Sequence, residues 1–483
     1  MIVSDSGLTK LKNSLLERVL LGHEPSPELL AILLVYFVQG ILGLARLAIS
    51  FFLKDNLGLS PAEVSALLGV VSIPWMVKPL FGFLSDGLPI LGYRRRPYLI
   101  LSGFLGALSW ITLATWVETG WQATAAIALG SLSIAVSDVI VDSIVVERAR
   151  AESVGAAGSL QSLCWGSSAI GGLLTAYFSG SLLEHFSTQT VFLITATFPM
   201  IVAAVAWLIS EDAVALKPDW KVVRHQLGQL KGALSQKTIW MPTAFLFLWQ
   251  ATPAAESAFF YFTTNELGFQ PEFLGRVRLV TSFAAIVGIW VFQRFLKAVP
   301  FRVIFAWSMV ISSLLGLTSL ILVTHANRAL GISDQWFSLG DSLILTVMGQ
   351  IAFMPVLVLA ARLCPPGVEA TLFALLMSVV NFAGLVSYEL GAGLMSWLGV
   401  TEQNFDKLWL LILITNLTSL LPLPLIGWLP GAADLAPDAA GTSITALELD
   451  PTASKHLSQP ILPDLVAELV PKSEAIAPVT TDP

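Results

Sequence analysis

Residues 121–146 read WQATAAIALGSLSIAVSDVIVDSIVV, and this stretch decides the fold. The hydrocarbon core of a bilayer is about 30 Å thick, and roughly 20 mainly apolar residues cross it as an α-helix. The stretch meets this requirement and carries only two charged side chains, Asp138 and Asp142. We therefore predict a transmembrane helix with two carboxyl groups inside the membrane.

Comparable apolar runs lie on both sides of this stretch, each bounded by glycine, proline or charge. The predicted spans are 29–53, 61–84, 98–117, 121–146, 155–183 and 190–209, then 238–264, 272–296, 301–324, 340–361, 367–398 and 405–428. A polar connector, residues 211–237, separates the two sets. Six spans, a charged connector and six more spans are typical of a duplicated secondary carrier. The sequence thus predicts an all-α polytopic protein with six-helix halves at 29–210 and 238–429.

The composition agrees with a membrane protein and argues against a soluble enzyme. Charged residues make up 12% of the 483-residue chain and hydrophobic residues 55%. Soluble domains carry about 25% charged residues. The two cysteines, Cys164 and Cys364, are too few for a disulfide framework or a metal site. We expect both to be packing residues, and we expect no metal and no cofactor.

The two ends of the chain differ from the apolar middle. Residues 1–28 lack the apolar core of a signal peptide, and their acidic residues argue against a transit peptide, so the first span is expected to be uncleaved. From Pro430 onward the chain is rich in Ala, Pro, Thr and acidic residues. We predict a cytoplasmic N-terminal segment at 1–28 and a disordered cytoplasmic tail at 430–483.

The distribution of positive charge predicts the orientation in the membrane. With the N-terminus inside, nineteen of the 26 lysines and arginines fall in cytoplasmic segments, and only Lys54, Arg328 and Lys407 fall in outer loops. Cytoplasmic loops of membrane proteins carry an excess of Lys and Arg. We therefore expect both termini in the cytoplasm.

Ionisable side chains inside spans are costly, so each is a candidate functional group. They either line a polar cavity or pair with one another to hold helices together. The uncharged polar residues in the spans likewise either bind a ligand or join helices. The charged candidates are Arg46, Lys78, Arg276, Arg278, Asp138, Asp142, Glu256 and Glu389, and the uncharged ones are Gln39, Gln161 and Asn381.

Asp138 and Asp142 are four residues apart and therefore share one helix face. Two carboxylates this close in a weakly solvated site resist simultaneous ionisation, so one of them should bind a proton. Proton-coupled transport requires such a group, and none of the five histidines lies mid-span. Asp142 has an alternative role, because with Glu147 it is placed to pair with Arg94–Arg96 at a cytoplasmic gate.

The loop between the second and third predicted spans carries a further motif. Gly82-Phe-Leu-Ser-Asp86 is followed by Arg94-Arg95-Arg96, which is similar to the signature loop of major facilitator carriers. In those carriers such charges latch the helical halves during alternating access. The interval here is longer and includes Pro89 and Gly92. We expect gating roles for Asp86, Arg94, Arg95, Arg96, Glu147 and Arg148.

Several segments of the first five spans carry a resemblance to one family. They are Val38-Gln39-Gly40, Lys78-Pro79-Leu-Phe-Gly82, Gly92-Tyr93-Arg94-Arg95-Arg96-Pro97-Tyr98, Asp138-Val-Ile-Val-Asp142-Ser143, Glu147-Arg148-Ala149-Arg150 and Gly158-Ser-Leu-Gln161-Ser162. Together they resemble the folate–biopterin transporter family, a branch of the major facilitator carriers, most closely its cyanobacterial and plastid members. The resemblance covers nearly all of the membrane portion, but not the tail.

The resemblance implies a major facilitator fold with twelve transmembrane helices. It also implies import of folates, with related pterins and antifolates as further substrates, by proton symport. The implied setting is a bacterial inner membrane, with a monomer surrounded by membrane lipid, protons as co-substrate and no nucleic-acid partner. The chain is then a transporter and not an enzyme.

The candidate residues suit a folate. A pterin edge presents adjacent N–H donors, which a carboxylate of Asp138 or Asp142 can accept. The two carboxylates of the glutamate moiety require cations such as Lys78 or Arg46. Aromatic side chains can stack on the flat rings, with Trp165, Phe259 and Tyr261 as candidates. The predicted substrate-binding set is Gln39, Arg46, Lys78, Asp138, Asp142, Gln161, Trp165, Glu256, Arg278, Asn381 and Glu389.

The charge of folate sets an expectation for coupling. Moving each negative charge into a negative interior costs about 2.3 kcal/mol per 100 mV. Co-transport of two protons cancels this electrical cost for a dianion. We therefore expect at least two protons per folate.

Three alternatives to a folate carrier make different demands on the sequence. An intramembrane aspartyl protease needs its two acids on separate facing helices, whereas Asp138 and Asp142 lie on one. A receptor or scaffold predicts no uptake and no need for balanced charges inside the spans. The serious alternative is a carrier of the same fold for another organic anion or a sugar.

Overall fold

The computed structural model describes residues 20, 23–151, 154–213, 232, 236–296, 299–362 and 369–430. Within these ranges the secondary structure is helical, apart from an isolated bridge between Ile90 and Tyr93 in a turn. The all-α prediction is confirmed. The predicted tail, most of the connector and most of the N-terminal segment lie outside the described residues.

The helices of the N-terminal half follow the six predicted spans. The first span is divided into three helical pieces, and so is the second, where Pro74 and Pro79 are the second residues of new pieces, a position that suits proline because it has no N–H to donate. The elements are α2 Pro27–Ile41, α3 Leu44–Phe51, η1 Phe52–Asn56, α4 Pro61–Val71, α5 Ile73–Met76, α6 Lys78–Gly87, α7 Arg96–Thr115, α8 Gly120–Ala151, α9 Val154–His185, α10 Thr188–Val205 and η2 Ala206–Leu208.

The C-terminal half repeats this organisation. Ten stretches of the described chain are long and apolar enough to cross a membrane, and α9 and the segment from α12 to η3 occupy the two remaining predicted positions. The elements are α12 Lys237–Gln250, α13 Glu256–Tyr261, η3 Phe262–Glu266, α14 Pro271–Val291, η4 Phe292–Leu296, α15 Phe301–Gly316, α16 Ser319–Val323, α17 Ala326–Ala329, α18 Asp334–Arg362, α19 Glu369–Leu398, α20 Leu408–Thr418 and η5 Leu423–Trp428.

A repeated turn relates the two halves. Residues 52–61 read FLKDNLGLSP and residues 262–271 read FTTNELGFQP, an offset of 210 positions. Each segment forms a short π-helix, reaches a glycine with positive φ (62° at Gly58, 67° at Gly268) and starts the next helix at proline. Both conformations need glycine because other residues are strained there. The weak sequence repeat thus becomes clear in three dimensions.

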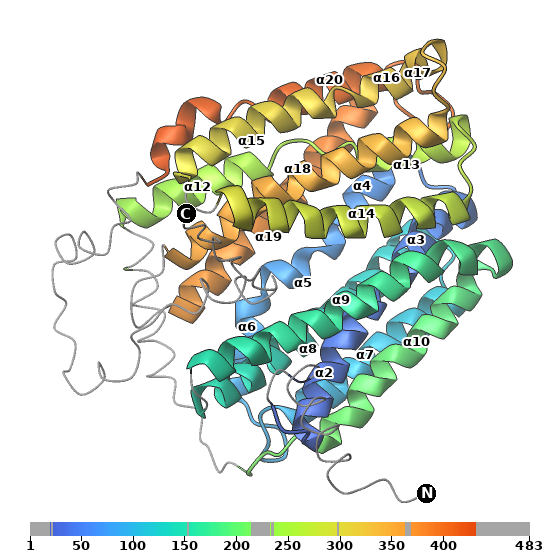
Figure 1. The fold of residues 1–483 in the computed structure, drawn as a ribbon. Helices are drawn as coiled ribbons and strands as arrows, with labels where there is room; N and C mark the ends of the chain where they lie inside the picture. The colour runs from blue at the N-terminus through green and yellow to red at the C-terminus, as the bar shows by residue number, and fades with distance from the viewer. Residues whose placement is uncertain are drawn as a thin grey trace, which may run out of the picture.

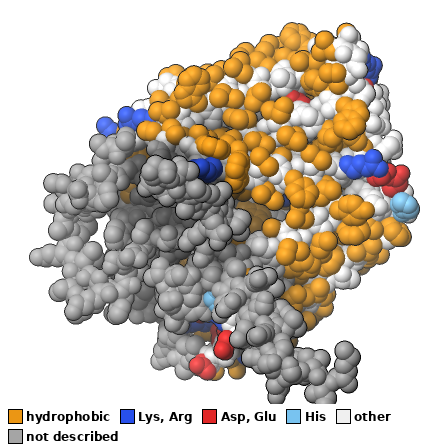
Figure 2. All heavy atoms as spheres, in the orientation of Figure 1, with side chains coloured by type: hydrophobic (Ala, Val, Ile, Leu, Met, Phe, Trp, Pro, Cys, Tyr) orange, Lys and Arg blue, Asp and Glu red, His pale blue; other side chains and the backbone are white. Residues whose placement is uncertain are grey.

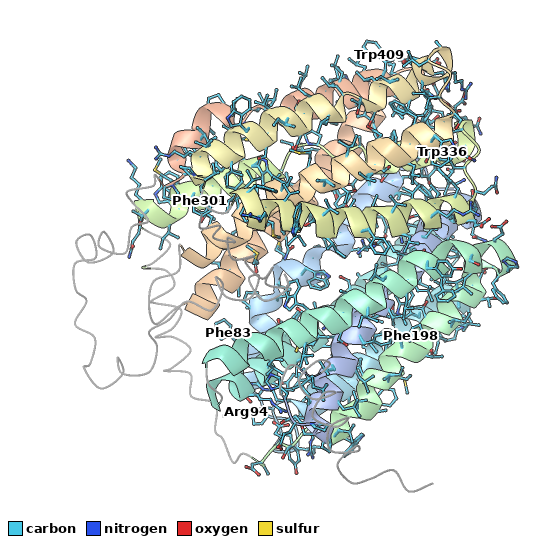
Figure 3. The ribbon with its side chains drawn as sticks, in the orientation of Figure 1. Phe83, Arg94, Phe198, Phe301, Trp336 and Trp409 are labelled. Carbon is cyan, nitrogen blue, oxygen red and sulfur yellow. The ribbon has the colours of Figure 1, made fainter. Side chains whose placement is uncertain are left out.

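The two halves lie side by side, and the molecule has two distinct ends (Figure 1). At one end α2 and α12 begin and η5 finishes, and we call this the connector side. At the other end lie η1 and η3, and we call this the loop side. The side-chain view places Arg94 at the connector side and Trp336 at the loop side (Figure 3).

The outer surface fits a lipid environment. Hydrophobic side chains cover most of the described face in view, and most of its charged side chains lie towards its ends (Figure 2). Trp336 is 72% exposed and Trp397 is 76% exposed. Indole rings are enriched where a membrane meets water. The chain is a multi-pass integral membrane protein.

Candidate functional site

The N-terminal half contains a partly buried ion pair between two spans. Lys78 begins α6 directly after the break at Val77, and its ammonium group pairs with Asp138 of α8. The same Lys78 Nζ lies 4.9 Å from the centre of the Trp75 ring. Lys78 is therefore neutralised by the protein itself, which weakens its prediction as a cation for substrate carboxylates.

Asp142 lies one turn further along α8 and has a different partner. The Tyr36 hydroxyl of α2 donates a hydrogen bond to the Asp142 carboxylate. Asp138 and Lys78 are close enough to interact electrostatically with Asp142. The group therefore holds two carboxyls and one ammonium cation, so one proton would bring it to neutrality. Tyr36 was not among the predicted residues, because nothing in the sequence links it to Asp142.

The uncharged polar candidates have different surroundings. The Gln39 amide nitrogen is buried without a hydrogen-bond partner in the described structure, beside a small cavity also lined by Ser133 and Ser137. Asn381 donates to the Trp75 carbonyl at 3.2 Å and so joins the two halves. Trp165 is 63% exposed. The Gln161 side chain lies outside the described structure.

A second charged group lies where the halves meet. Arg278 of α14 and Arg46 of α3 come from opposite halves and are close enough to repel each other. Tyr388 of α19 donates to Glu256 Oε2 at 3.3 Å and also lies within electrostatic range of Arg46. Glu389 of α19 approaches Gly69 of α4, whose added Cβ would lie 2.9 Å from Glu389 Oε1.

The two arginines lack the partner that such a pair requires. In the described part of the chain, neither the Arg46 nor the Arg278 guanidinium forms an ion pair with a carboxylate. Arg276, only two residues from Arg278, instead pairs with Glu272 one turn earlier on α14. Two guanidinium groups within electrostatic range of each other, without a described carboxylate partner, are suited to binding an anion.

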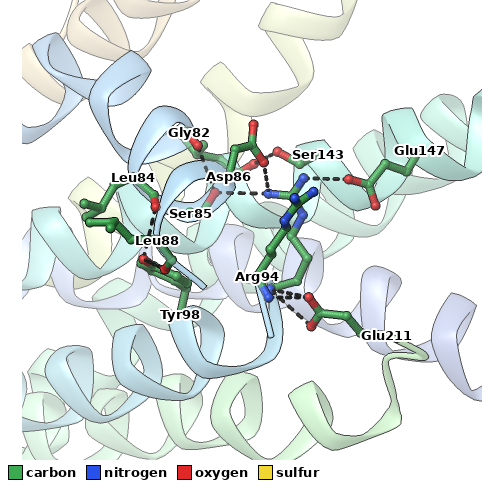
Figure 4. Close-up of polar contacts among 12 residues, drawn as sticks. Gly82, Leu84, Ser85, Asp86, Leu88, Arg94, Tyr98, Ser143, Glu147 and Glu211 are labelled. Carbon is green, nitrogen blue, oxygen red and sulfur yellow. Dashed lines mark hydrogen bonds and ion pairs between the residues drawn. The ribbon is translucent and has the colours of Figure 1, made fainter. Parts of the chain in front are cut away.

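The connector side of the N-terminal half is built around Arg95, which is 7% exposed. Its guanidinium pairs with Asp86 at 2.8 Å and with Glu147 at 2.5 Å, and it donates to the Ser85 hydroxyl at 3.0 Å (Figure 4). Burial lowers the pKa of Arg95, but the Glu147 and Asp86 carboxylates more than offset this, and the pKa lies above its usual value. Arg95 thus joins α6, α7 and α8.

Glu211 completes this cluster from the end of α10 and η2. The backbone N–H groups of Arg94, Arg95 and Arg96 all donate to its carboxylate, which caps the N-terminus of α7. The Arg96 side chain donates to the Ile209 carbonyl at 2.6 Å. Arg148 of α8 approaches Glu28 of α2 at 3.6 Å. The contacts described for Asp86, Arg95 and Glu147 lie within the N-terminal half.

On the loop side the two repeated turns meet each other. Lys54 donates to Asn265 at 2.8 Å, and the Tyr261 hydroxyl donates to the Leu59 carbonyl at 2.5 Å. The rings of Phe51 and Phe260 lie edge to face with centroids 5.3 Å apart. Tyr261 is fully buried in this contact, so it is not available to stack on a ligand, and that prediction is wrong for this conformation.

Further hydrogen bonds between the halves continue from the loop side to the middle of the bundle. Ser65 of α4 donates to the Tyr388 carbonyl at 2.8 Å, and the contact between Asn381 and Trp75 lies deeper. Beyond Trp75, no hydrogen bond between the halves is formed among the described residues. The halves are therefore joined on the loop side and through the middle.

Asp341 is an intramembrane carboxyl that the predicted set omitted. It lies in α18, inside the predicted span 340–361, and accepts hydrogen bonds from Thr318 and Ser319. The signal was present in the sequence as an acidic residue near the start of a span. Asp341 was overlooked because it lies close to the end of the predicted span.

Comparison with solved structures defines the fold class of the chain. The nucleoside transporter NupG superposes with a TM-score of 0.63 at 14% identity, covering 83% of this chain and 98% of that one. A D-xylose-proton symporter superposes with a TM-score of 0.61 at 15% identity, covering 83% and 98%. Together with the repeated halves, this likeness confirms the major facilitator fold.

Sequence comparisons then give the family. The chain belongs to the BT1 family, whose model matches residues 39–445. It is 64% identical to the "Folate-biopterin transporter" of Synechocystis sp., over 87% of this chain and 85% of that protein. It is also 33% identical to the "Probable folate-biopterin transporter 2" of Arabidopsis thaliana, over 80% and 79%. The "Folate transporter 2" of Plasmodium falciparum is 30% identical over 83% and 88%.

Proposed function

We propose that this chain imports folates by proton symport and alternating access, with related pterins and antifolates as further substrates. The names of the relatives support folate as the substrate. The observation that carries the proposal is the pair of arginines, Arg46 and Arg278, which come from opposite halves, lie within electrostatic range of each other and have no described ion-pair partner. This pair suits the two carboxylates of the glutamate moiety.

The arginine pair changes where each end of the substrate is expected to bind. Guanidinium groups bind carboxylates in a bidentate manner, whereas Lys78 is occupied by Asp138. The anionic end therefore binds at Arg46 and Arg278, and the N–H edge of the pterin faces a carboxylate of the same group, Glu256 or Glu389. Asp138 and Asp142 are then left for protons rather than for the pterin.

Proton coupling rests on the cluster of Asp138, Asp142 and Lys78. Two carboxyl groups share one cation inside the membrane, so binding a proton removes an uncompensated charge. The Tyr36 hydroxyl donates to Asp142 and holds its side chain in place. Protonation at this cluster supplies one of the two protons that balance a folate dianion.

The contacts between the halves support alternating access. The loop side is held closed by Lys54, Asn265 and Tyr261. The excess of Lys and Arg supports a cytoplasmic connector side, and in the proposed orientation this conformation faces inward. We propose a monomer in the inner membrane of a bacterium, with both termini cytoplasmic.

Uptake into proteoliposomes tests the proposal. The purified protein should accumulate radiolabelled folate when the pH gradient is imposed, with competition by methotrexate and by p-aminobenzoylglutamate. Arg278→Gln should lower folate uptake at least tenfold, whereas the matched control Arg276→Gln, which alters an arginine paired with Glu272, should leave it unchanged. Equal loss in both variants would refute the assignment of the arginine pair.

A second candidate function is transport of a different organic anion. The arginine pair recognises carboxylates and does not by itself require a pterin. Competition by unrelated dicarboxylates without competition by folate or methotrexate would favour this candidate. Uptake of folate that is indifferent to the pH gradient would instead refute the symport mechanism.

A further inference from the structure

The C-terminal half has its own intramembrane carboxyl group, Asp341. It lies seven residues after the start of α18 at Asp334, which is about 10 Å along a helix that rises 1.5 Å per residue. It faces a break in the ninth span, where α15 ends at Gly316 and α16 begins at Ser319. At the break, a Cβ on Gly316 would lie 1.8 Å from Asn416 Oδ1, so α20 packs tightly against this glycine.

Two hydroxyl groups from the break contact the Asp341 carboxyl. Thr318 Oγ1 lies 2.5 Å from Oδ1, and Ser319 Oγ lies 2.8 Å from Oδ2. The Thr318 hydroxyl also contacts the Leu315 carbonyl. Leu315 O, Thr318 Oγ1, the Asp341 carboxyl and Ser319 Oγ thus form a row of oxygen atoms with three close contacts.

The protons available for these contacts can be counted. A hydroxyl has one proton to donate, and a backbone carbonyl or an ionised carboxylate only accepts. With Asp341 ionised, Thr318 and Ser319 supply two protons for three contacts. With Asp341 protonated, its O–H donates to Thr318, Thr318 donates to Leu315, and Ser319 donates to the other carboxyl oxygen. Each contact then holds one proton.

Among the described residues, no cation pairs with Asp341 to stabilise its ionised form. The Asp341 carboxyl makes no ion pair with a described residue, and α16 carries no charged side chain. Removing a carboxylate from water without a paired cation favours its neutral form. The charged or titratable groups on the elements packed around it are Glu272, Arg276 and Arg278 on α14, Arg302 on α15, His325 and Arg328 at α17, Asp334 and Arg362 on α18, and Glu369, Tyr388 and Glu389 on α19.

We propose that Asp341 is a proton-binding site of the C-terminal half and that it carries the second proton of the transport cycle. The first part rests on the hydrogen-bond count alone. The second part rests on the proposed symport of a folate dianion, for which the cluster at Asp138 and Asp142 supplies only one proton. Release would follow when the hydroxyls of Thr318 and Ser319 move relative to α18.

Infrared spectroscopy of the reconstituted protein tests the first part without any substrate. The C=O stretch of a protonated carboxyl should be present at neutral pH and lose one component in Asp341→Asn. The matched control Asp334→Asn, which changes an acid paired with Arg328 at 2.8 Å, should keep that component. Thr318→Val should keep it at a shifted frequency, because the acid O–H loses its acceptor. An unchanged spectrum in Asp341→Asn would overturn the proposal.

Uptake tests the second part. Asp341→Asn can form the same three contacts, because its amide donates to Thr318 and its oxygen accepts from Ser319. The variant should retain exchange of labelled for unlabelled folate. Its accumulation of folate under a pH gradient should be at least tenfold lower than that of the unaltered protein. Retained accumulation with a lost infrared component would overturn the coupling role. Absence of folate transport by the unaltered protein would refute the proposed function and leave the infrared result standing.

Discussion

Removing one hydroxyl group at the loop side should shift the balance between inward-facing and outward-facing states. The Tyr261 hydroxyl donates to the Leu59 carbonyl across the two halves, and Tyr261 is fully buried. This hydrogen bond exists only while the loop side is closed. Tyr261→Phe keeps the ring and its packing and removes only the bond between the halves.

The expected change in the ratio of outward-facing to inward-facing molecules follows from the free energy that one hydrogen bond contributes. A neutral hydrogen bond contributes about 1 kcal/mol net. A loss of about 1 kcal/mol changes an equilibrium constant roughly fivefold. Tyr261→Phe should therefore raise the ratio of outward-facing to inward-facing molecules about fivefold.

Single-molecule fluorescence transfer between the halves measures this ratio. Fluorophores attached at Glu118→Cys and Gln335→Cys, one in each half, measure the distance across the loop side. The native cysteines are replaced in this background. Both positions are exposed. Tyr177→Phe is the control, because Tyr177 is 61% exposed on α9 and no described hydrogen bond uses its hydroxyl. A ratio that stays within twofold in Tyr261→Phe would refute the assignment of this contact as part of the loop-side closure.

Three further predictions concern the N-terminal half. Glu211→Ala removes the cap from the N-terminus of α7 and should destabilise the protein by about 1–2 kcal/mol, read as a lower thermal midpoint, whereas Glu118→Ala should not. Asp142→Asn should abolish accumulation driven by a pH gradient but keep folate exchange, and loss of both activities would argue for a binding role instead. Tyr36→Phe should keep coupling and change its pH dependence, because Asp142 loses its donor, and an unchanged pH profile of uptake would contradict this.

The sequence was sufficient for the fold because its signal is long and local. Each span needs about 20 apolar residues, and a charged side chain inside such a run stands out without knowledge of its neighbours. The same reasoning found Lys78, Asp138, Arg46 and Arg278. Asp341 escaped because it lies near the end of its predicted span, where a charge is less unusual.

The pairing of those charges could not be predicted, because it depends on which helices meet. The balance of four cations and four anions gave no indication that Lys78 pairs with Asp138 while Arg46 and Arg278 form no described ion pair and lie within electrostatic range of each other. Glu211 is a similar case. It lies more than a hundred residues from Arg94 in the chain, and only the packing of α10 against α7 brings it to the start of that helix.

The first span connects the proton cluster to the anion site. Tyr36 on α2 donates to Asp142, and Arg46 on α3 lies within electrostatic range of Arg278 of the other half. The two residues are about 15 Å apart along the span, and the break between Ile41 and Leu44 lies between them. An unbroken helix would tie the position of Arg46 rigidly to that of Tyr36. In the proposed mechanism the break would let α2 stay packed on Asp142 while α3 adjusts to the substrate. Substrate binding and proton binding would then use separate charges that are joined by one interrupted span, which is what coupled transport of an anion and a proton requires.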